Sequence, residues 1–575
     1  KPVGCSIKYG TQASRYWAWG HPTANNCTWA QGRAAVLTAA NAAPFVAHNG
    51  GFEAAILRDY FDWTPPNSEW IHDTVFLLFL TNPYEQQMSL KLSAARLLNW
   101  PPEEQDDLRT WILQNVPEAR VTPSEWGAYI CRAPGDLVGR YACGDTDRTS
   151  ALFDLLYPLV VEHGMEPAYR REQKLAPILW ESTRQGLRLD VEALERDYLY
   201  FRQLQRASQD FIFGELGEFE ISKKDQLADA LERAGQVTHW ERTPTGRRST
   251  KRVNLMKNVK DPELMAHLAY YTMLETCLGT FGEPWLALAE SDGRLHASWN
   301  QVRGARNGEN SDGARTGRMS CSAPNLTNVP NDFEDFVFPQ DVGPILLRRY
   351  LLPEDGHIWF KRDFDAQEMR WLANYSEGKL SDAFHADPKA DPHATVGRLI
   401  LDATGIELPR KHVKTTGFGI MYGRGIASTA AALGIPLEQG EQVRNAYFAA
   451  LPEVRALSSG VRKRLQGGGF IRTWGGRIYY VEPNPDRDLA YKGLNYLIQG
   501  SAADQTKESI IAWHATRGHG AQLLAAVHDE INISAPEGCG QMRLLREAMD
   551  ADRADVPFRS QGYKGPNWAT LEKCA

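Results

Sequence analysis

The sequence lacks the marks of several protein classes. Its eight cysteines are scattered and no C-x-x-C pair is present, so neither a zinc site nor a disulfide framework is indicated. No apolar run is long enough to cross a membrane, and no signal peptide is visible. The net charge of −7 argues against a blanket of positive charge, although a local basic groove would suffice for nucleic acid. We expect several domains, a cytoplasmic location and reduced thiols.

One stretch, residues 410–423, has an unusual order of side chains. Arg410, Lys414, Phe418 and Tyr422 recur every four residues, which places them on one face of a helix. Two cations at a helix N-terminus are unfavourable unless a polyanion binds there. Phosphates at the cations, with a sugar and base at the rings, would describe a nucleoside triphosphate. A surface helix with a basic start is the alternative that the row alone leaves open.

Carboxylates mark two further segments. The apolar stretch HIWFKRDFD reads as a strand that brings Asp363 to its end, and the following helix carries Glu368. The segment AQLLAAVHDEINISAP is typical of a β-hairpin with His528, Asp529 and Glu530 at its turn. If the two segments share a sheet, their carboxylates could hold two metal ions that activate a 3′-hydroxyl and neutralise a triphosphate. Either site alone could equally be an ordinary turn acid.

The first 185 residues alternate between short strands and helices, which predicts an α/β region. Glu53 follows a strand, and Tyr141 and Asp145 share a helix face. Carboxylates near strand ends could hold metals for phosphodiester hydrolysis, although Asp145 could also be a plain first-turn residue.

Two polar loops lie further along the chain. Residues 241–252 hold five cations around a turn, which suits sequence-independent phosphate contact or simply a solvated loop. Residues 314–330 carry Arg318, Asn325 and Asn328, whose donors suit acceptors at the minor-groove edge of base pairs.

Several of these motifs together resemble a known family. DFDAQEMR, RKHVKTTGFGIMYG and VHDE resemble motifs A, B and C of family A DNA polymerases, the group of bacterial DNA polymerase I and its Klenow fragment, with many phage relatives. TGRMSCSAPNLTNVP resembles the primer–template loop of this family, and LNYLIQGSAAD resembles its motif before the last hairpin. NGGFE and YACGD look like the second and third motifs of the 3′–5′ proofreading exonuclease. A phage origin is compatible with this pattern.

The resemblance implies a role for each matching residue. Asp363 and Asp529 would ligate two Mg²⁺ ions, with the Phe364 backbone carbonyl as a further ligand and Glu530 in support; Mn²⁺ can substitute. The dNTP would contact Arg410, Lys414, Phe418, Tyr422, His393 and Glu368, the last as a steric gate against a 2′-hydroxyl. The primer–template minor groove would be lined by Arg318, Asn325, Asn328, Asn495, Gln499 and His528. The exonuclease candidates would be Glu53, Tyr141 and Asp145.

The implied architecture is multidomain α/β and α+β. We expect an RNase H-like 3′–5′ exonuclease-type domain over residues 1–185 and a right-hand polymerase domain over 186–575. Thumb would span about 190–300, palm about 301–372 and 485–575, and fingers about 373–484. The exonuclease's Asp-x-Glu strand is absent and the chain begins at Lys1, so we expect an N-terminally incomplete domain with weak or no nuclease activity. A monomer that binds primer–template DNA and dNTPs, with no membrane contact, is expected.

The match has departures, and alternatives stay open. In the first motif, the family often has Ser and Gln where this chain has Asp365 and Ala366. Elsewhere it often has Asn at the position of Gly417, Gln at that of Thr327 and Arg at that of Tyr491. These positions surround the nascent pair, so fidelity and base preference do not follow from the resemblance. A single-subunit RNA polymerase and a catalytically inactive DNA-binding scaffold are the competing hypotheses.

Overall fold

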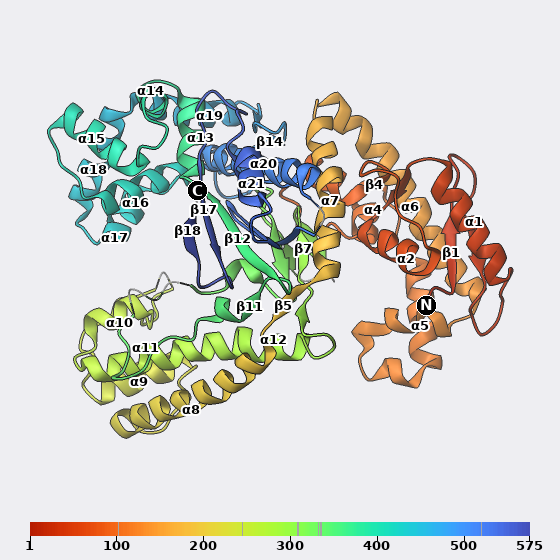
Figure 1. The fold of residues 1–575 in the computed structure, drawn as a ribbon, viewed down its shortest axis with the longest axis horizontal. Helices are drawn as coiled ribbons and strands as arrows, with labels where there is room; N and C mark the ends of the chain where they lie inside the picture. The colour runs from red at the N-terminus through yellow and green to blue at the C-terminus, as the bar shows by residue number, and fades with distance from the viewer. Residues whose placement is uncertain are drawn as a thin grey trace.

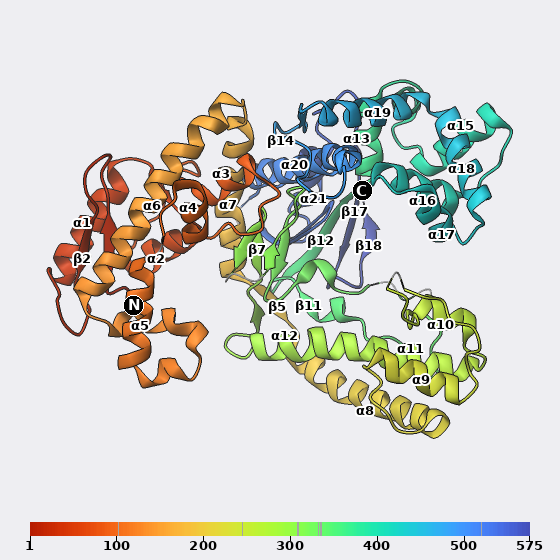
Figure 2. The ribbon, with the colours of Figure 1, turned by 180° about the vertical axis from the view of Figure 1, so that it is seen from behind.

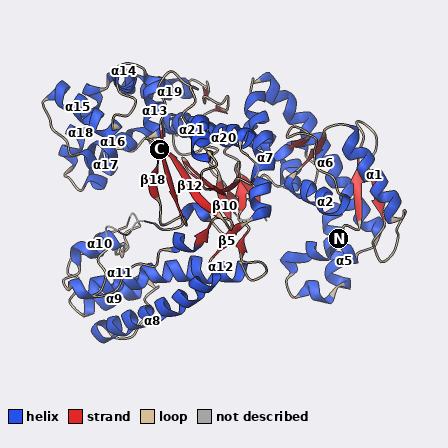
Figure 3. Cartoon of the chain, in the orientation of Figure 1, coloured by secondary structure: helices blue, strands red, loops and turns tan. Residues whose placement is uncertain are grey.

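The computed structural model describes residues 1–101, 103–243, 245–306, 310–331, 333, 336–518 and 520–574. Three helical lobes surround a central antiparallel sheet, and the strands of that sheet gather in the middle of the molecule (Figures 1 and 3). The N-terminal region lies on one side, and the other two lobes face each other across the open end of the sheet (Figures 1 and 2).

The N-terminal region, residues 1–162, confirms the predicted mixture of short strands and helices. Its strands pair as an antiparallel β1–β2 hairpin and a parallel β3–β4 pair. Its helices include α3, an almost wholly apolar segment that is buried against α6. The elements are β1 (Gly4–Ile7), β2 (Arg15–Ala18), α1 (Trp29–Ala42), β3 (Phe45–Ala47), α2 (Gly51–Phe61), β4 (Ile71–Asp73), α3 (Thr74–Thr81), α4 (Leu90–Leu98), α5 (Glu103–Asn115) and α6 (Gly135–Glu162).

Helix α7 (Glu166–Gln185) connects the N-terminal region to the rest of the chain and belongs to both cores. Tyr169 packs with the N-terminal core, whereas Leu175 and Leu179 pack with the core around the central sheet. Between them, Glu172 pairs with Lys507 of helix α20 (Gly493–Thr516), and both side chains are 0% exposed. Burying two opposite charges together removes the larger cost of burying either alone, so this pair fixes α7 against α20.

The second lobe is a set of helices with small strands at its base. Helices α8 and α11 are its long antiparallel members, and Asp190 and Asp261 cap them by accepting backbone N–H groups. The elements are β5 (Leu187–Leu189), α8 (Val191–Leu216), α9 (Lys224–Arg233), α10 (Arg252–Asn258), α11 (Pro262–Thr276), α12 (Glu283–Leu288), β6 (Arg294–Leu295), β7 (Ser298–Asn300), β8 (Gly304–Arg306), β9 (Asn310–Asp312), β10 (Ser320–Ser322) and β11 (Leu351–Leu352).

The central sheet has the strand order β15–β16–β12–β17–β18, all antiparallel. Successive residues of a strand face opposite sides, so Phe360 joins the core under α20 while Trp359 joins the core against the second lobe. The strands and their covering helices are β12 (His357–Phe364), α13 (Gln367–Ser376), α20 (Gly493–Thr516), β15 (Gln522–Val527), β16 (Glu530–Pro536), α21 (Gln541–Met549), β17 (Ser560–Gly565) and β18 (Glu572–Cys574).

The third lobe is inserted between α13 and α20. Its core joins that of the sheet through Val413, Ile420 and Tyr447. Its elements are α14 (Lys379–Ala386), α15 (Pro392–Thr404), α16 (Arg410–Met421), α17 (Ile426–Leu433), α18 (Leu437–Ala450), α19 (Pro452–Gln466), β13 (Ile471–Arg472) and β14 (Ile478–Tyr479). Across the described residues, no helix is both long and apolar enough to span a membrane.

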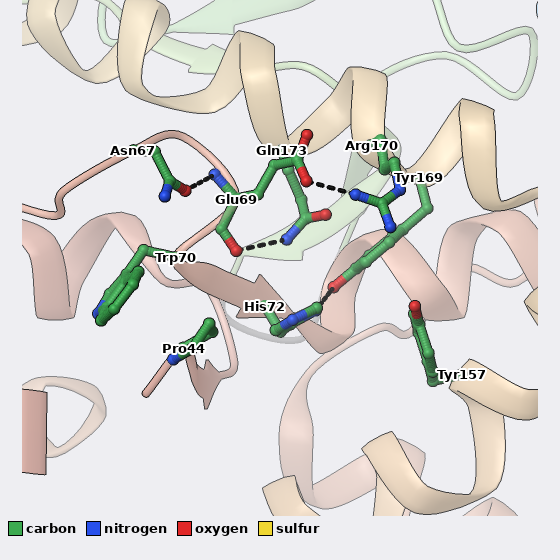
Figure 4. Close-up of a pocket in the computed structure, with 9 residues that line it drawn as sticks. All are labelled: Pro44, Asn67, Glu69, Trp70, His72, Tyr157, Tyr169, Arg170 and Gln173. Atoms are coloured by element: carbon green, nitrogen blue, oxygen red, sulfur yellow. Dashed lines mark hydrogen bonds and ion pairs between the residues drawn. The ribbon is translucent and has the colours of Figure 1, made fainter. Parts of the chain in front are cut away.

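A cavity of about 310 Å³ lies in the N-terminal region, between the start of β4 and α7 (Figure 4). Trp70, His72, Tyr157 and Tyr169 contribute rings to its walls, and an Arg170–Glu69 ion pair lies at its edge. The rings also pack on one another, because His72 stacks on Tyr169 with centroids 5.9 Å apart. This cavity lies at the N-terminal ends of β3 and β4. None of the predicted site residues is among the residues that line it.

Candidate active site

The two predicted carboxylate segments meet on the central sheet. β12 and β16 are neighbours, with Asp363 directly opposite Glu530 in the register. Asp529 lies in the tight β15–β16 turn, and its carbonyl accepts a 3.3 Å hydrogen bond from the Phe364 N–H. The preceding residue, His528, has φ of +59°, which the two-residue turn requires. The predicted strand end and hairpin tip are therefore adjacent, although 166 positions (529 − 363) separate them in sequence.

The electrostatics of this corner are those of concentrated negative charge. Burial and the nearby Asp529 and Glu530 raise the pKa of Asp363 well above its usual range. Burial also raises the pKa of Asp529, which the charges of Glu368 and Glu530 raise further and Arg318 partly lowers. The Asp363 Oδ1 atom is buried without a hydrogen-bond partner. A cation bound between the two aspartates would relieve both the repulsion and the unsatisfied oxygen.

Glu530 is held differently from the two aspartates. Its Oε1 accepts hydrogen bonds from Trp568 Nε1 at 2.9 Å and from Asn532 Nδ2 at 2.7 Å, and its Oε2 pairs with Lys361 Nζ at 2.7 Å. A carboxylate with both oxygens engaged is a support for the site and not a free ligand. These contacts give a physical reason for the predicted supporting role of Glu530.

The donor set suits a hard divalent cation. Mg²⁺ is characteristically bound by one or two carboxylates, with its other ligands supplied by water and substrate phosphates. Asp363 and Asp529 supply two such carboxylates, and the Phe364 carbonyl lies in the same strand. No group of three or more His, Cys, Asp or Glu side chains with metal-site geometry exists among the described residues, which agrees with Glu530 being occupied elsewhere.

Helix α16 carries the predicted row of side chains. It begins at Arg410 and ends at Met421, with Tyr422 as the C-cap residue. The Phe418 and Tyr422 rings stack with centroids 5.9 Å apart and an interplanar angle of 12°. Lys414 is exposed and, within the part of the chain that the structure describes, forms no ion pair.

Two residues of α15 flank this row. Arg410 pairs with Asp391, the N-cap of α15, with Arg410 Nε 3.2 Å from Asp391 Oδ2. The His393 ring lies 5.9 Å from that of Phe418, and its Nδ1 atom is buried without a partner. Burial and the nearby cations lower the pKa of His393 to about 4, so the ring is neutral at pH 7. A neutral imidazole with an unused nitrogen is suited to hydrogen-bond an incoming phosphate.

The predicted gate residue connects the row to the carboxylates. Glu368 is in the first turn of α13 and is 8% exposed. Its Oε2 accepts a 2.9 Å hydrogen bond from the Tyr422 hydroxyl, and its Oε1 pairs with Arg318. Glu368 therefore lies between the row on α16 and the turn that carries Asp529.

The other predicted primer–template residues lie around this centre. Against the raising effects of burial and Glu368, Gln499 acts to lower the pKa of Tyr422. The Asn495 Oδ1 atom is buried without a partner, and His528 is exposed. Asn325 caps the short 3₁₀ turn at Leu326–Asn328 by accepting the Thr327 N–H at 3.0 Å.

The structure also shows what surrounds the five residues that depart from the family pattern. A Cβ added to Gly417 would lie 3.1 Å from the buried, unpartnered hydroxyl of Tyr447. The Asp365 Oδ1 atom accepts a 2.5 Å hydrogen bond from Gln561, the β17 residue opposite Asp363. The remaining departures are Ala366 at a φ of +49°, Thr327 in the 3₁₀ turn beside Asn325, and Tyr491 against Gly423.

The basic loop is only partly available for phosphate contact. Arg248 pairs with Asp229 and Glu232, and Arg252 lies 3.6 Å from the centre of the Phe336 ring. Pro244 lies outside the described residues. Exposed Arg242, Arg247 and Lys251 remain as candidates, so the loop carries fewer free cations than its composition predicts.

Three residues that matter at the site were not identified from the sequence. Lys361 and Trp568 hold Glu530, and Gln561 holds Asp365. Alternation along β12 places Lys361 on the same face as Asp363, and this is the one signal that could have identified it. Nothing in the sequence marks Trp568 or Gln561.

The exonuclease candidates divide into two groups. Tyr141 and Asp145 share a face of α6, as predicted, and burial together with the Asp145 charge raises the pKa of Tyr141. Glu53 lies in the first turn of α2, where burial raises its pKa to about 8 and leaves its Oε2 atom unpartnered. The Asp73 charge raises the pKa of Glu53 further, and Glu53 in turn raises the pKa of Cys5.

Fold and site together define a class. An antiparallel sheet that brings two half-buried aspartates together, faced by a helix with a cation–aromatic row, is the arrangement expected of a nucleotidyl-transferring polymerase. The family model described as DNA polymerase family A matches residues 192–570, and the chain belongs to this family. It is a template-directed DNA polymerase, and its family implies dependence on divalent metal ions.

Individual comparisons agree with this membership. The chain is 25% identical over 474 residues to DNA polymerase DpoZ of Vibrio phage phiVC8, covering 76% of this chain and 72% of that protein. It is 30% identical over 406 residues to the DNA polymerase of Mycobacterium phage L5, covering 69% and 61%. It is 26% identical over 544 residues to DNA polymerase I of Treponema pallidum, covering 91% of this chain and 51% of that protein.

A solved structure shows the same fold. The polymerase domain of Pol1 from M. smegmatis, solved with DNA primer–template and dNTP, superposes with a TM-score of 0.76 at 22% sequence identity. The superposition covers 97% of this chain and 91% of that one. The comparisons favour neither the RNA polymerase nor the inactive-scaffold hypothesis.

Proposed function

We propose that this chain extends a DNA primer by adding dNTPs. Asp363 and Asp529 would be the ligands of two Mg²⁺ ions, and the Phe364 backbone carbonyl would be a further protein ligand. When bound, the ions would lower the pKa of the primer 3′-hydroxyl and neutralise the charge that develops on the transferring phosphoryl group. The observation that carries this proposal is that the strand end with Asp363 lies beside the turn with Asp529, and that the Asp363 Oδ1 atom is buried without a hydrogen-bond partner.

The residues of α16 and α15 hold the nucleotide. Lys414 supplies the free positive charge for the triphosphate, and Arg410 adds a second cation once it exchanges Asp391 for phosphate. His393 donates a hydrogen bond as a neutral ring. The Phe418–Tyr422 stack gives the sugar and base a flat surface, because stacking is favourable for every base.

Selection and alignment fall to residues around the gate. Glu368, fixed by Tyr422 and Arg318, fills the space beside the sugar and excludes a 2′-hydroxyl. Primer–template positioning is assigned to donors that suit the minor-groove acceptors common to every base pair. These donors are Arg318, Asn325, Asn328, Asn495, Gln499 and His528.

The domain assignment follows from the same roles. The thumb would span about 190–300, which is supported by the helical second lobe. The palm would span about 301–372 and 485–575, around the central sheet, and the fingers about 373–484, in the inserted third lobe. Residues 1–185 would be an exonuclease-type domain with weak or no activity. The monomeric state and the cytoplasmic location remain predictions.

The proposal is tested by primer extension on a defined template with each metal and each nucleotide class. Extension with dNTPs and Mg²⁺, and weak use of rNTPs, is the expected result. Comparable use of rNTPs and dNTPs would revive the RNA polymerase hypothesis. DNA binding without incorporation under Mg²⁺ or Mn²⁺ would favour the scaffold.

A further inference from the structure

A second cluster of charged side chains, in the N-terminal region, has no part in the polymerase chemistry. Lys91 of α4 places its Nζ atom 2.6 Å from Asp145 Oδ1 and 4.2 Å from the centre of the Tyr141 ring. The Lys91 side chain is 15% exposed and that of Asp145 is 26% exposed. The ammonium group therefore lies where the carboxylate and the tyrosine converge, which is where hydrolysis would need a divalent metal ion and its water.

The neighbouring charges are balanced as well. Arg148, one turn after Asp145, pairs with both carboxylate oxygens of Glu104 and donates a 2.7 Å hydrogen bond to the Pro101 carbonyl. Lys91 and Arg148 thus match Asp145 and Glu104, two cations for two acids. A site with no excess negative charge has little to offer a divalent cation, which would also have to displace a shielded ammonium group.

Glu53 does not complete a metal site with this cluster. It lies on α2 beside Cys5 and Asp73, and both Asp73 oxygens accept the backbone N–H groups of Asn49 and Gly50. Asp145 already has a cation partner in Lys91, whereas Asp363 forms no ion pair among the described residues. The residues around Asp145 therefore do not fit a divalent metal ion.

We propose that Lys91 is the resident cation of this site: its ammonium group stands in place of a divalent metal ion at Asp145, and the N-terminal region supports the polymerase without hydrolysing DNA. The inference rests on the exonuclease-type assignment of residues 1–185. It is independent of Asp363 and Asp529, so its failure is distinguishable from failure of the polymerase assignment, which would appear as loss of primer extension in the unmodified chain.

The metal test uses the full chain carrying Asp363→Asn and Asp529→Asn, so that bound Mn²⁺ reports on the rest of the molecule. Electron paramagnetic resonance of free Mn²⁺ is expected to show no Asp145-dependent binding in this background. Mn²⁺ binding that disappears on adding Asp145→Asn would overturn the proposal. So would digestion of a mismatched primer end that Asp145→Asn abolishes.

The pairing test is a thermal-unfolding cycle of Lys91→Met, Asp145→Asn and their combination, read in metal-free buffer. Each single change should lower the midpoint by a few degrees because it leaves one shielded charge unpaired, and the combination should recover most of that loss. Lys91→Arg is the matched control and should keep the midpoint near that of the unmodified chain. Additive losses, with no recovery in the combination, would contradict the pairing. Primer extension should be unchanged by Lys91→Met.

Discussion

The Tyr422 hydroxyl donates a 2.9 Å hydrogen bond to Glu368 Oε2, which links the C-cap of α16 to the first turn of α13. The two residues are 54 positions apart, and Arg318 holds the other oxygen of the same carboxylate. Burial and the adjacent Glu368 raise the pKa of Tyr422 to about 12, so the phenol stays protonated and remains a donor. The carboxylate of the proposed gate residue is thus held from two directions.

This relationship predicts how sugar discrimination can be weakened. Glu368→Ala should raise rNTP use relative to dNTP use by about 10- to 100-fold, because the space for a 2′-hydroxyl opens. Tyr422→Phe should have a smaller effect, since Arg318 still holds the carboxylate. The measurement is the ratio of kcat/KM for a matched dNTP and rNTP. An unchanged ratio in Glu368→Ala would show that this carboxylate is not the gate.

Lys414 should matter for the nucleotide and not for the DNA. Lys414→Ala is expected to lower kcat/KM for dNTP by roughly 100-fold or more, as removal of one charge-stabilising group typically does. Arg410→Ala should cost less, because Arg410 already has Asp391 as a partner. Lys411→Ala, at the neighbouring exposed position of the same helix, is the control. If Lys414→Ala weakens primer–template binding as much as it weakens dNTP use, α16 has a structural role and does not bind the nucleotide.

Gly417 should be sensitive to size through a single contact. Gly417→Ala places a Cβ 3.1 Å from the Tyr447 hydroxyl, and this crowding should lower stability by about 1–3 kcal/mol and slow incorporation. Tyr447→Phe removes a buried hydroxyl that has no partner, so it should be neutral or stabilising. In the Tyr447→Phe background the cost of Gly417→Ala should largely vanish in denaturant unfolding. If Gly417→Ala lowers the stability equally with and without Tyr447→Phe, the crowding does not involve the Tyr447 hydroxyl.

The buried Glu172–Lys507 pair predicts a pH-dependent effect. Burial lowers the pKa of Lys507 to about 8, below its ordinary value of 10.5, despite the Glu172 partner. Glu172→Gln should therefore destabilise the chain by about 3–5 kcal/mol at pH 7, because it leaves the ammonium group without its counter-ion.

The sign of the pH effect follows from proton binding. Between the folded and unfolded pKa values the unfolded chain holds more protons, so stability rises as the pH increases toward 10.5. Loss of Glu172 lowers the pKa of folded Lys507 further, so the difference in thermal midpoint between Glu172→Gln and the unmodified chain should narrow as the pH rises toward about 8 and stay constant above it. A difference that widens with pH would contradict a charged Lys507 at neutral pH.

Much of the site was predictable because its signals are local. Strand alternation around Asp363, the hairpin with Asp529 at its turn and the four-residue spacing of the α16 row each follow from backbone periodicity. Their meeting on one sheet came from the family resemblance, since no local rule pairs segments so far apart in the chain.

The parts that were not predictable depend on tertiary contacts. Trp568 supports Glu530 from a segment with no motif, and Lys91 reaches Asp145 from a separate helix. Composition predicted a free basic loop, but Arg248 and Arg252 find partners that lie outside it. The consequence of Gly417 also depended on Tyr447, which lies on another helix.

The central claim is that Asp363 and Asp529 together support template-directed nucleotide addition. The most direct measurement is single-nucleotide incorporation on a primer–template with Mg²⁺, comparing the unmodified chain with Asp363→Asn and Asp529→Asn. The account predicts that each change reduces incorporation by about 1,000-fold or more while primer–template binding and the thermal midpoint are retained. Incorporation near the unmodified rate in either variant would contradict it.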